Sequence, residues 1–184
     1  MQEAPKTAPP KLPHDAEWLL TDGAGGFACG AVDGLSRRRY HAAWIAWPTG
    51  SERRHNVVAA FDERLPSTQP PAHLLAAHWR GQAQPSPGAG RVAFTARPLP
   101  TWTFTVGAAV LERTLALRPV AVGAPCLLVR YRNLGSAALR LEVRPLLGWC
   151  DADHLIAADE RFDATVHARG ASWGVRPDDR LPRK

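Results

Sequence analysis

The chain has 184 residues, of which 45% are hydrophobic and 22% are charged, the balance of an ordinary globular protein. No apolar run approaches the roughly 20 residues that a membrane-spanning helix needs, which excludes such a span. The net charge of +6 reflects 20 arginines against 3 lysines. Apart from residues 37–39 and 53–54 these arginines are scattered, which argues against a nucleic-acid-binding surface, where positive charge is gathered on one face.

The N-terminal residues 1–14 contain four prolines and no apolar core of a signal peptide. They are predicted to be a disordered leader ahead of a single domain that spans residues 15–184, and the protein is predicted to be cytoplasmic. The cysteines Cys29, Cys126 and Cys150 stand far apart without a CxxC pair. We therefore expect reduced thiols rather than disulfides or a zinc site.

Hydrophobic residues recur with a period of two along most of the chain, as in half-buried strands. In "TWTFTV", Trp102, Phe104 and Val106 alternate with threonines, and "LRLEVRP" repeats the pattern from Leu139. Long amphipathic helices are not expected. Strands are predicted at residues 40–47, 56–65, 92–97, 101–106, 110–118, 126–132, 139–143 and 164–173.

Short strands punctuated by glycine and by 17 prolines favour an all-β fold, an antiparallel β-sandwich. The turn signal at residues 133–136, Asn-Leu-Gly-Ser, predicts a hairpin between the strand at 126–132 and its successor. Residues 84–91, "QPSPGAGR", are predicted to form a loop.

A glycine-rich segment runs through "EWLLTDGAGGFACGAVDGLSRRRYHAAWIAW" at residues 17–47. Glycines at this density indicate tight turns or a close approach of the backbone to another group. Gly23, Gly25 and Ala28 have the spacing of a dinucleotide-binding turn, but strand-like residues follow where that motif requires a helix. The segment therefore does not predict a nucleotide site.

Acidic residues gather in "GWCDADHL". On an extended strand Asp151 and Asp153 would lie about 6.5 Å apart on one face, near the separation used by inverting glycosidases, whereas the alternative is that they cap a turn. Cys150, Asp151 and His154 lack a fourth metal ligand, so no metal or other cofactor is predicted.

Seven tryptophans are present, and four of them flank the glycine-rich and acidic segments. Indole rings offer apolar faces to sugar rings, but large aromatic side chains also dominate protein cores, so both roles stay open. The four are Trp18, Trp44, Trp47 and Trp149.

Several ordered blocks carry a resemblance: the segment at residues 17–47, then "FDERL", "LPTWTFTVGAAVLERTLAL", "LLVRYRNLG" and "LRLEVRPLLGWCDADHL". Over residues 17–155 the chain resembles the N-terminal domain of bacterial and archaeal glycogen debranching enzymes. The resemblance implies a β-sandwich (supersandwich-like) ahead of a catalytic (α/α)6 barrel. In that barrel one acid protonates the leaving oxygen of an α-1,6 branch linkage while a carboxylate activates water.

The barrel is not within the 184 residues, so this chain is expected to be an excised fragment or a free-standing relative without catalytic acids. The sandwich is expected to be incomplete at its C-terminal end. Three positions depart from the family pattern: Asp22 replaces an asparagine, Ala42 replaces a glycine, and Cys150 replaces an arginine. The last change removes a charged group from an expected ligand-facing loop.

The resemblance implies that an α-glucan, glycogen or a maltooligosaccharide, and a catalytic barrel in cis or in trans are the partners. If residues 38–41 continue a strand, Arg39 and His41 share one face and Arg38 and Tyr40 the other. A purely structural role for these side chains is an alternative, as are a stand-alone carbohydrate-binding module and a basic nucleic-acid-binding protein. The predicted substrate-binding residues are Asp22, Arg39, His41, Asp151 and His154.

Overall fold

The structure, a computed structural model, describes residues 15–77, 89–119, 125–154 and 163–175. The predicted leader at residues 1–14 and most of the predicted loop at 84–91 lie outside these ranges. The described residues form strands without any helix, which confirms the all-β prediction, and they include no helix that could cross a membrane. The strands are β1 (Glu17–Thr21), β2 (Phe27–Ala31), β3 (Ala42–Ala46), β4 (His55–Leu65), β5 (Ala72–His73), β6 (Arg91–Thr95), β7 (Thr101–Val106), β8 (Ala109–Pro119), β9 (Pro125–Asn133), β10 (Glu142–Asp151), β11 (Val166–Arg169) and β12 (Ser172–Val175).

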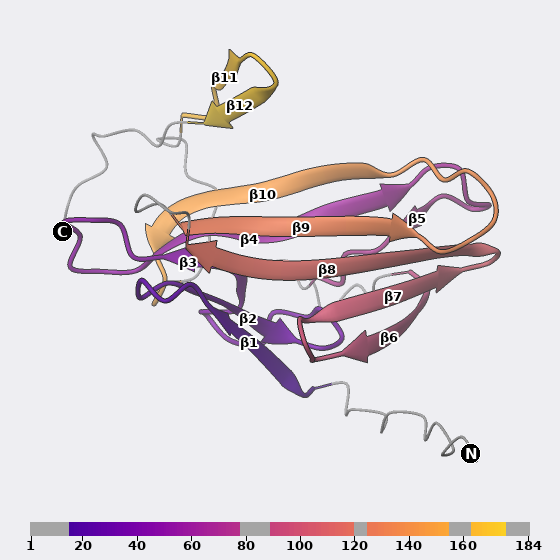
Figure 1. Cartoon of the computed structure of the whole chain (residues 1–184), viewed down its shortest axis with the longest axis horizontal. Helices are drawn as coiled ribbons and strands as arrows, with labels where there is room; N and C mark the ends of the chain where they lie inside the picture. Colours follow the sequence, from indigo (N-terminus) through magenta and orange to yellow (C-terminus); the bar gives the residue numbers. More distant parts are fainter. Residues whose placement is uncertain (1–14, 78–88, 120–124, 155–162, 176–184) are drawn as a thin grey trace, which may run out of the picture.

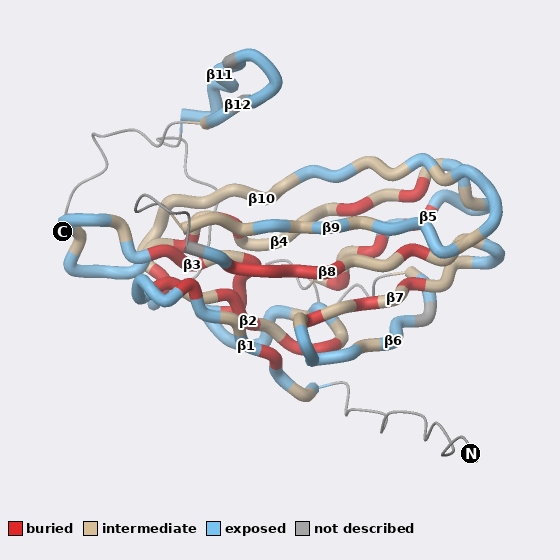
Figure 2. The backbone as a smooth tube through the Cα atoms, viewed as in Figure 1, coloured by how far each residue is buried: buried red, intermediate tan, exposed pale blue. Residues whose placement is uncertain are grey.

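Two antiparallel sheets form the body of the molecule (Figure 1). The first has the order β1-β2-β3-β4-β10, with β5 paired to β4, and the second has the order β6-β7-β8-β9. The strands β11 and β12 form a separate hairpin, in which the residues of described burial are exposed except for half-buried Val175 (Figure 2). This arrangement agrees with the predicted antiparallel β-sandwich.

The core lies between the two sheets and is built from large apolar side chains. Trp102 and Phe104 are buried on β7, which confirms the period-two prediction there. Trp18 of β1 meets Trp102 edge to face, with ring centroids 5.2 Å apart. Leu65 of β4 and Leu115 of β8 complete the same cluster, so both sheets contribute to one core.

One charged contact crosses this core. Glu63 of β4 is 0% exposed, and both of its carboxylate oxygens accept from the Arg113 guanidinium of β8, at 3.0 and 2.9 Å. The Tyr131 hydroxyl of β9 donates to the same carboxylate at 2.7 Å. Burial, together with the neighbouring Glu63 carboxylate, raises the pKa of Tyr131, which keeps the hydroxyl protonated as a donor. The pair therefore links the first sheet to the second.

Two local predictions are wrong. The turn at residues 133–136 does not make a hairpin, because β9 pairs with β8 while β10 pairs with β4 in the other sheet. The chain crosses between the sheets at this turn. The predicted single strand at residues 164–173 is instead the β11–β12 hairpin, which turns around Gly170, a residue with φ of +59°.

Loss of the Glu63 charge is expected to be severely destabilising. Glu63→Gln removes the carboxylate and leaves the Arg113 guanidinium inside the core without its ionic partner. Breaking one half of a buried pair typically costs about 3–5 kcal/mol. Urea denaturation monitored by tryptophan fluorescence measures the change in the free energy of unfolding. The control is Glu142→Gln, which breaks the exposed Arg140–Glu142 pair and is expected to change that free energy by no more than about 0.5 kcal/mol. Equal stabilities of the two variants would contradict the assigned role of Glu63.

Candidate functional site

Three connections of the first sheet come together at one end of it. The strand register pairs Thr21 with Phe27, Ala46 with His55, and His55 with Asp151. The turn at residues 22–26, the loop at 47–54 and the turn at 151–154 are therefore neighbours. We call the surface formed by these three segments, together with His55 and Trp149, the loop-end surface.

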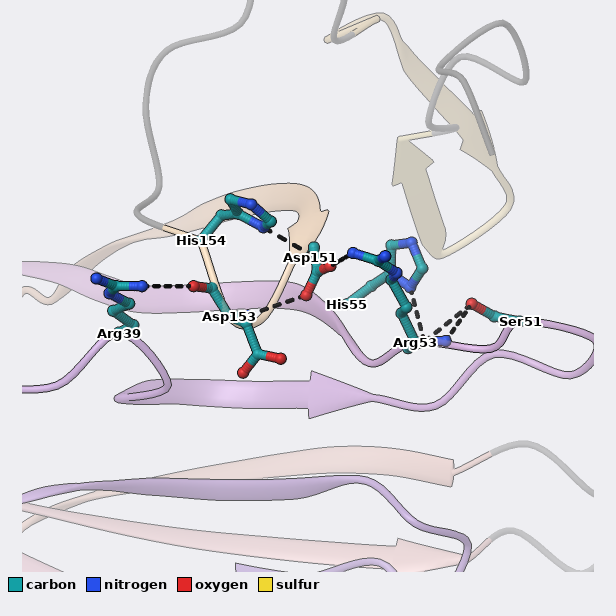
Figure 3. A network of polar contacts seen from close by, with 7 residues as sticks. All are labelled: Arg39, Ser51, Arg53, His55, Asp151, Asp153 and His154. Atoms are coloured by element: carbon teal, nitrogen blue, oxygen red, sulfur yellow. Dashed lines mark hydrogen bonds and ion pairs between the residues drawn. The ribbon is translucent and has the colours of Figure 1, made fainter. Parts of the chain in front are cut away.

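Asp151 is the last residue of β10 and organises the turn that follows. Its Oδ1 accepts the backbone N–H of Asp153 at 3.0 Å, and its Oδ2 accepts from Arg53 at 2.5 Å (Figure 3). His154 Nδ1 lies 3.6 Å from the same Oδ2. Asp153 thus lies in a turn rather than on an extended strand, and the capping interpretation is confirmed for Asp151.

The Asp153 amide, followed by the Arg53 guanidinium, holds the pKa of Asp151 below its usual value. The hydrogen bond with the Asp151 carboxylate raises the pKa of Arg53 in turn. Both groups are consequently ionised throughout the neutral range. The loop-end surface therefore presents an ionised carboxylate and an ionised guanidinium side by side, which suits hydrogen bonding to hydroxyl groups.

Arg39 approaches the same turn from the connection between β2 and β3. Its guanidinium donates to the backbone carbonyl of Asp153 at 3.4 Å (Figure 3). Beneath the turn, Ala152 is buried against Ala42 and Ile45 of β3. The turn is thus held by an apolar contact below and by Arg39 at its edge.

Aromatic rings also line the loop-end surface. Trp149 stacks on His55 with centroids 4.8 Å apart and an interplanar angle of 25°. The register of β10 against β4 shifts between Leu147 and Cys150, and such irregularities re-aim the side chains beside them. Trp149 is half-buried here, at the shift.

Trp47 is the most exposed tryptophan of the loop-end surface, at 44%. Its indole N–H donates to the Ser51 carbonyl at 2.7 Å, and the Arg54 guanidinium lies 4.7 Å from its ring centroid. By contrast, Trp18 belongs to the core and Trp44 packs against it. Two of the four singled-out tryptophans are therefore core residues, and two lie at the loop end.

The glycines of the turn at residues 22–26 allow close packing. Gly25 has φ of +93°, and a Cβ there would lie 2.9 Å from the Trp47 ring. A Cβ on Gly26 would lie 2.7 Å from the Ile45 carbonyl oxygen. Asp22 is 1% exposed, and its Oδ1 accepts the backbone N–H groups of Ala24 and Gly26. Asp22 therefore shapes the turn from inside.

His41 is buried and the expected strand alternation around it is wrong. Residues 38–41 form a turn in which the His41 N–H donates to the Arg38 carbonyl at 3.0 Å, so exposed Arg39 and buried His41 do not share a face. His41 Nδ1 accepts the Arg37 N–H at 3.2 Å, and Nε2 lies 3.3 Å from Glu17 Oε1. The His41 ring thus lies between this turn and β1.

Of the five predicted ligand residues, Arg39, Asp151 and His154 meet at the turn after β10, whereas Asp22 and His41 are buried in two other turns. Their role in sugar binding stays a prediction. Sequence reasoning missed Arg53 and His55, although both lie just before the strand predicted at residues 56–65. The sequence signal for these residues was the polar run "RRHN" at residues 53–56. Its position beside Asp151 could not be predicted, because it depends on the pairing of β4 with β10.

Fold and loop-end surface together define an antiparallel β-sandwich domain with a polar, aromatic-lined end. Comparison with protein families matches residues 16–182 to the family described as glycogen debranching enzyme N terminal. The chain belongs to this family, which confirms the resemblance drawn from the sequence blocks. Searches of curated proteins and of solved structures returned no match.

The depressed pKa of Asp151 predicts a specific acid response. Because the folded chain keeps this carboxylate ionised to lower pH than the unfolded chain does, its stabilising contribution is present above the usual aspartate value of about 3.9 and is lost as pH falls through the folded pKa. Carboxyl NMR titration of the folded chain is expected to give a pKa below that value. Arg53→Gln should raise the pKa of Asp151 only part of the way to the usual value, since the hydrogen bond from the Asp153 amide remains. A value at or above the usual one in the unsubstituted chain would contradict the geometry.

Proposed function

We propose that this chain is a glucan-binding accessory domain of a glycogen debranching-type glycoside hydrolase. Its family membership supports the association with such an enzyme. In this proposal the domain packs against a catalytic (α/α)6 barrel that hydrolyses α-1,6 branch linkages, and the chain itself contributes binding rather than proton transfer.

The observation that carries the proposal is the combination of rings and fixed charges on the loop-end surface. The exposed indole of Trp47 and the stacked Trp149–His55 pair offer apolar ring faces. Arg53, in the loop before β4, and Asp151, at the end of β10, form an ion pair with an N–O distance of 2.5 Å, so they offer a donor and an acceptor side by side. Sugar rings have apolar faces bordered by hydroxyl groups, and this pattern of ring and charge is complementary to them.

The predicted ligand residues divide into two roles. Asp151 and His154, from the turn after β10, and Arg39, which donates to that turn, contact the glucan. Asp22 and His41 support binding indirectly, because they hold the turn at residues 22–26 and the turn at 38–41 in shape. This division follows burial: the first three side chains reach solvent and the last two do not.

Charge pairing favours a glucan over nucleic acid as the ligand. Several arginines of the described part of the chain are paired with carboxylates, as in Arg37–Asp33, Arg38–Glu17 and Arg144–Asp62. A phosphate-binding surface would need these guanidinium groups unpaired and gathered on one face.

Titration with maltohexaose and with a branched α-glucan, followed by tryptophan fluorescence, tests the proposal. Saturable binding is expected, because Trp47 and Trp149 lie at the loop-end surface. Arg53→Gln or Asp151→Asn should weaken it about 2–10-fold, the range expected for losing one hydrogen bond of about 0.5–1.5 kcal/mol.

Arg140→Gln is the matched control, since Arg140 is an exposed arginine that also pairs with a carboxylate but lies outside the loop-end surface. It is expected to bind like the unsubstituted chain. The proposal fails if the folded chain binds neither glucan, or if Arg140→Gln weakens binding as much as Arg53→Gln does.

A further inference from the structure

Strand β9 is the long, regular outer strand of the second sheet. Among the described residues it pairs only with β8, in an unbroken register from Asn133 opposite Leu111 to Pro125 opposite Pro119. The outer strands β1 and β6 are shorter, with five residues each, and β10 is less regular, because it contains Pro145 and register shifts. Proteins commonly protect sheet edges by such shortening, prolines and bulges, and β9 has none of these after its first residue, Pro125.

The hydrogen-bond pattern shows which backbone groups of β9 face away from β8. The Leu134 N–H donates to the Val110 carbonyl, one residue beyond the Asn133–Leu111 pair. Antiparallel pairs alternate between hydrogen-bonded and non-hydrogen-bonded types, so Asn133 begins the non-hydrogen-bonded set. The N–H and C=O groups of Leu127, Val129 and Tyr131 therefore point toward the outer edge.

Side chains along β9 add charge and apolar surface to this edge. On the outer face, Leu128 is 49% exposed, and the Arg130 and Arg132 side chains are 68% and 58% exposed. Both guanidinium groups share one carboxylate, that of Glu112 on β8, at 3.5 and 3.0 Å. Two positive charges against one negative charge leave a surplus of positive charge at the edge.

The inner face of β9 is also incompletely covered. Leu127, Val129 and Tyr131 pack against the core but are only half-buried. An additional strand beside β9 would cover these side chains and satisfy the outward backbone groups at the same time.

We propose that β9 is the acceptor for strand addition by an extended acidic segment of another polypeptide. Charge complementarity selects acidic side chains, two residues apart, opposite Arg132 and Arg130, and an apolar side chain opposite Leu128. Main-chain hydrogen bonds supply affinity in this mode of recognition, and the alternate side chains supply specificity. The surface is separate from the loop-end surface, so this inference does not depend on glucan binding.

A synthetic peptide, acetyl-TEVEVLVT-amide, is the probe. In antiparallel register its two glutamates face Arg132 and Arg130, and its leucine faces Leu128. Binding is measured by calorimetry, and amide hydrogen exchange is followed by NMR in the free and bound chain. The amides of Val129 and Tyr131 are expected to exchange at least tenfold more slowly when the peptide is bound, whereas the amide of Arg130, already bonded to β8, should change little.

Charge specificity is tested with the peptide in which lysine replaces both glutamates, and with the variant Arg130→Gln/Arg132→Gln. Each change is expected to weaken binding at least tenfold. The variant Arg140→Gln/Arg144→Gln loses two exposed arginines elsewhere and should bind the acidic peptide normally.

Three results would overturn the proposal. The first is no binding of the acidic peptide to the folded chain, and the second is equal binding of the lysine peptide. The third is slow exchange of Val129 and Tyr131 in the free chain together with a dimer in sedimentation, because a second copy would then occupy the edge.

Discussion

The buried carboxylate of Glu63 is the contact on which the arrangement of the two sheets depends. A charge in a protein core is tolerated only when it is paired and hydrogen-bonded, and both partners of Glu63, Arg113 and Tyr131, come from the opposite sheet. Apolar packing alone would tolerate a shift of one sheet over the other. The ion pair does not, since a shift would leave the Glu63 and Arg113 charges buried and separate. It therefore specifies how β4 faces β8 and β9.

This fixed arrangement extends to the loop-end surface through β4. The strand carries Glu63 in the core and begins at His55, which pairs with Asp151 of β10 and stacks on Trp149. The same rigid strand thus sets the relative positions of the sheet contact and of the polar cluster at its end. Side chains on strand ends, such as His55 and Asp151, are held more precisely than those on loops.

Local patterns in the sequence predicted the elements better than their partners. Alternation at Trp102 and Phe104 identified β7 correctly, because burial on one face repeats every second residue. The Asn133 turn was also local: its side chain bonds Gly135 and Ala137 as a turn residue does. The predicted pairing of the strands on either side of this turn was wrong, because a turn sequence does not specify which sheet the next strand joins. Arg53 was missed for the same reason, since its partner Asp151 lies 98 residues away.

Backbone NMR with added maltohexaose tests the central claim, glucan recognition at the loop-end surface, most directly. The account predicts saturable chemical-shift changes concentrated at residues 22–26, 47–55 and 149–154, where the turns, the exposed Trp47 and the Asp151 cluster meet. Shift changes confined to β6–β9, or none at saturating sugar in a folded chain, would contradict it.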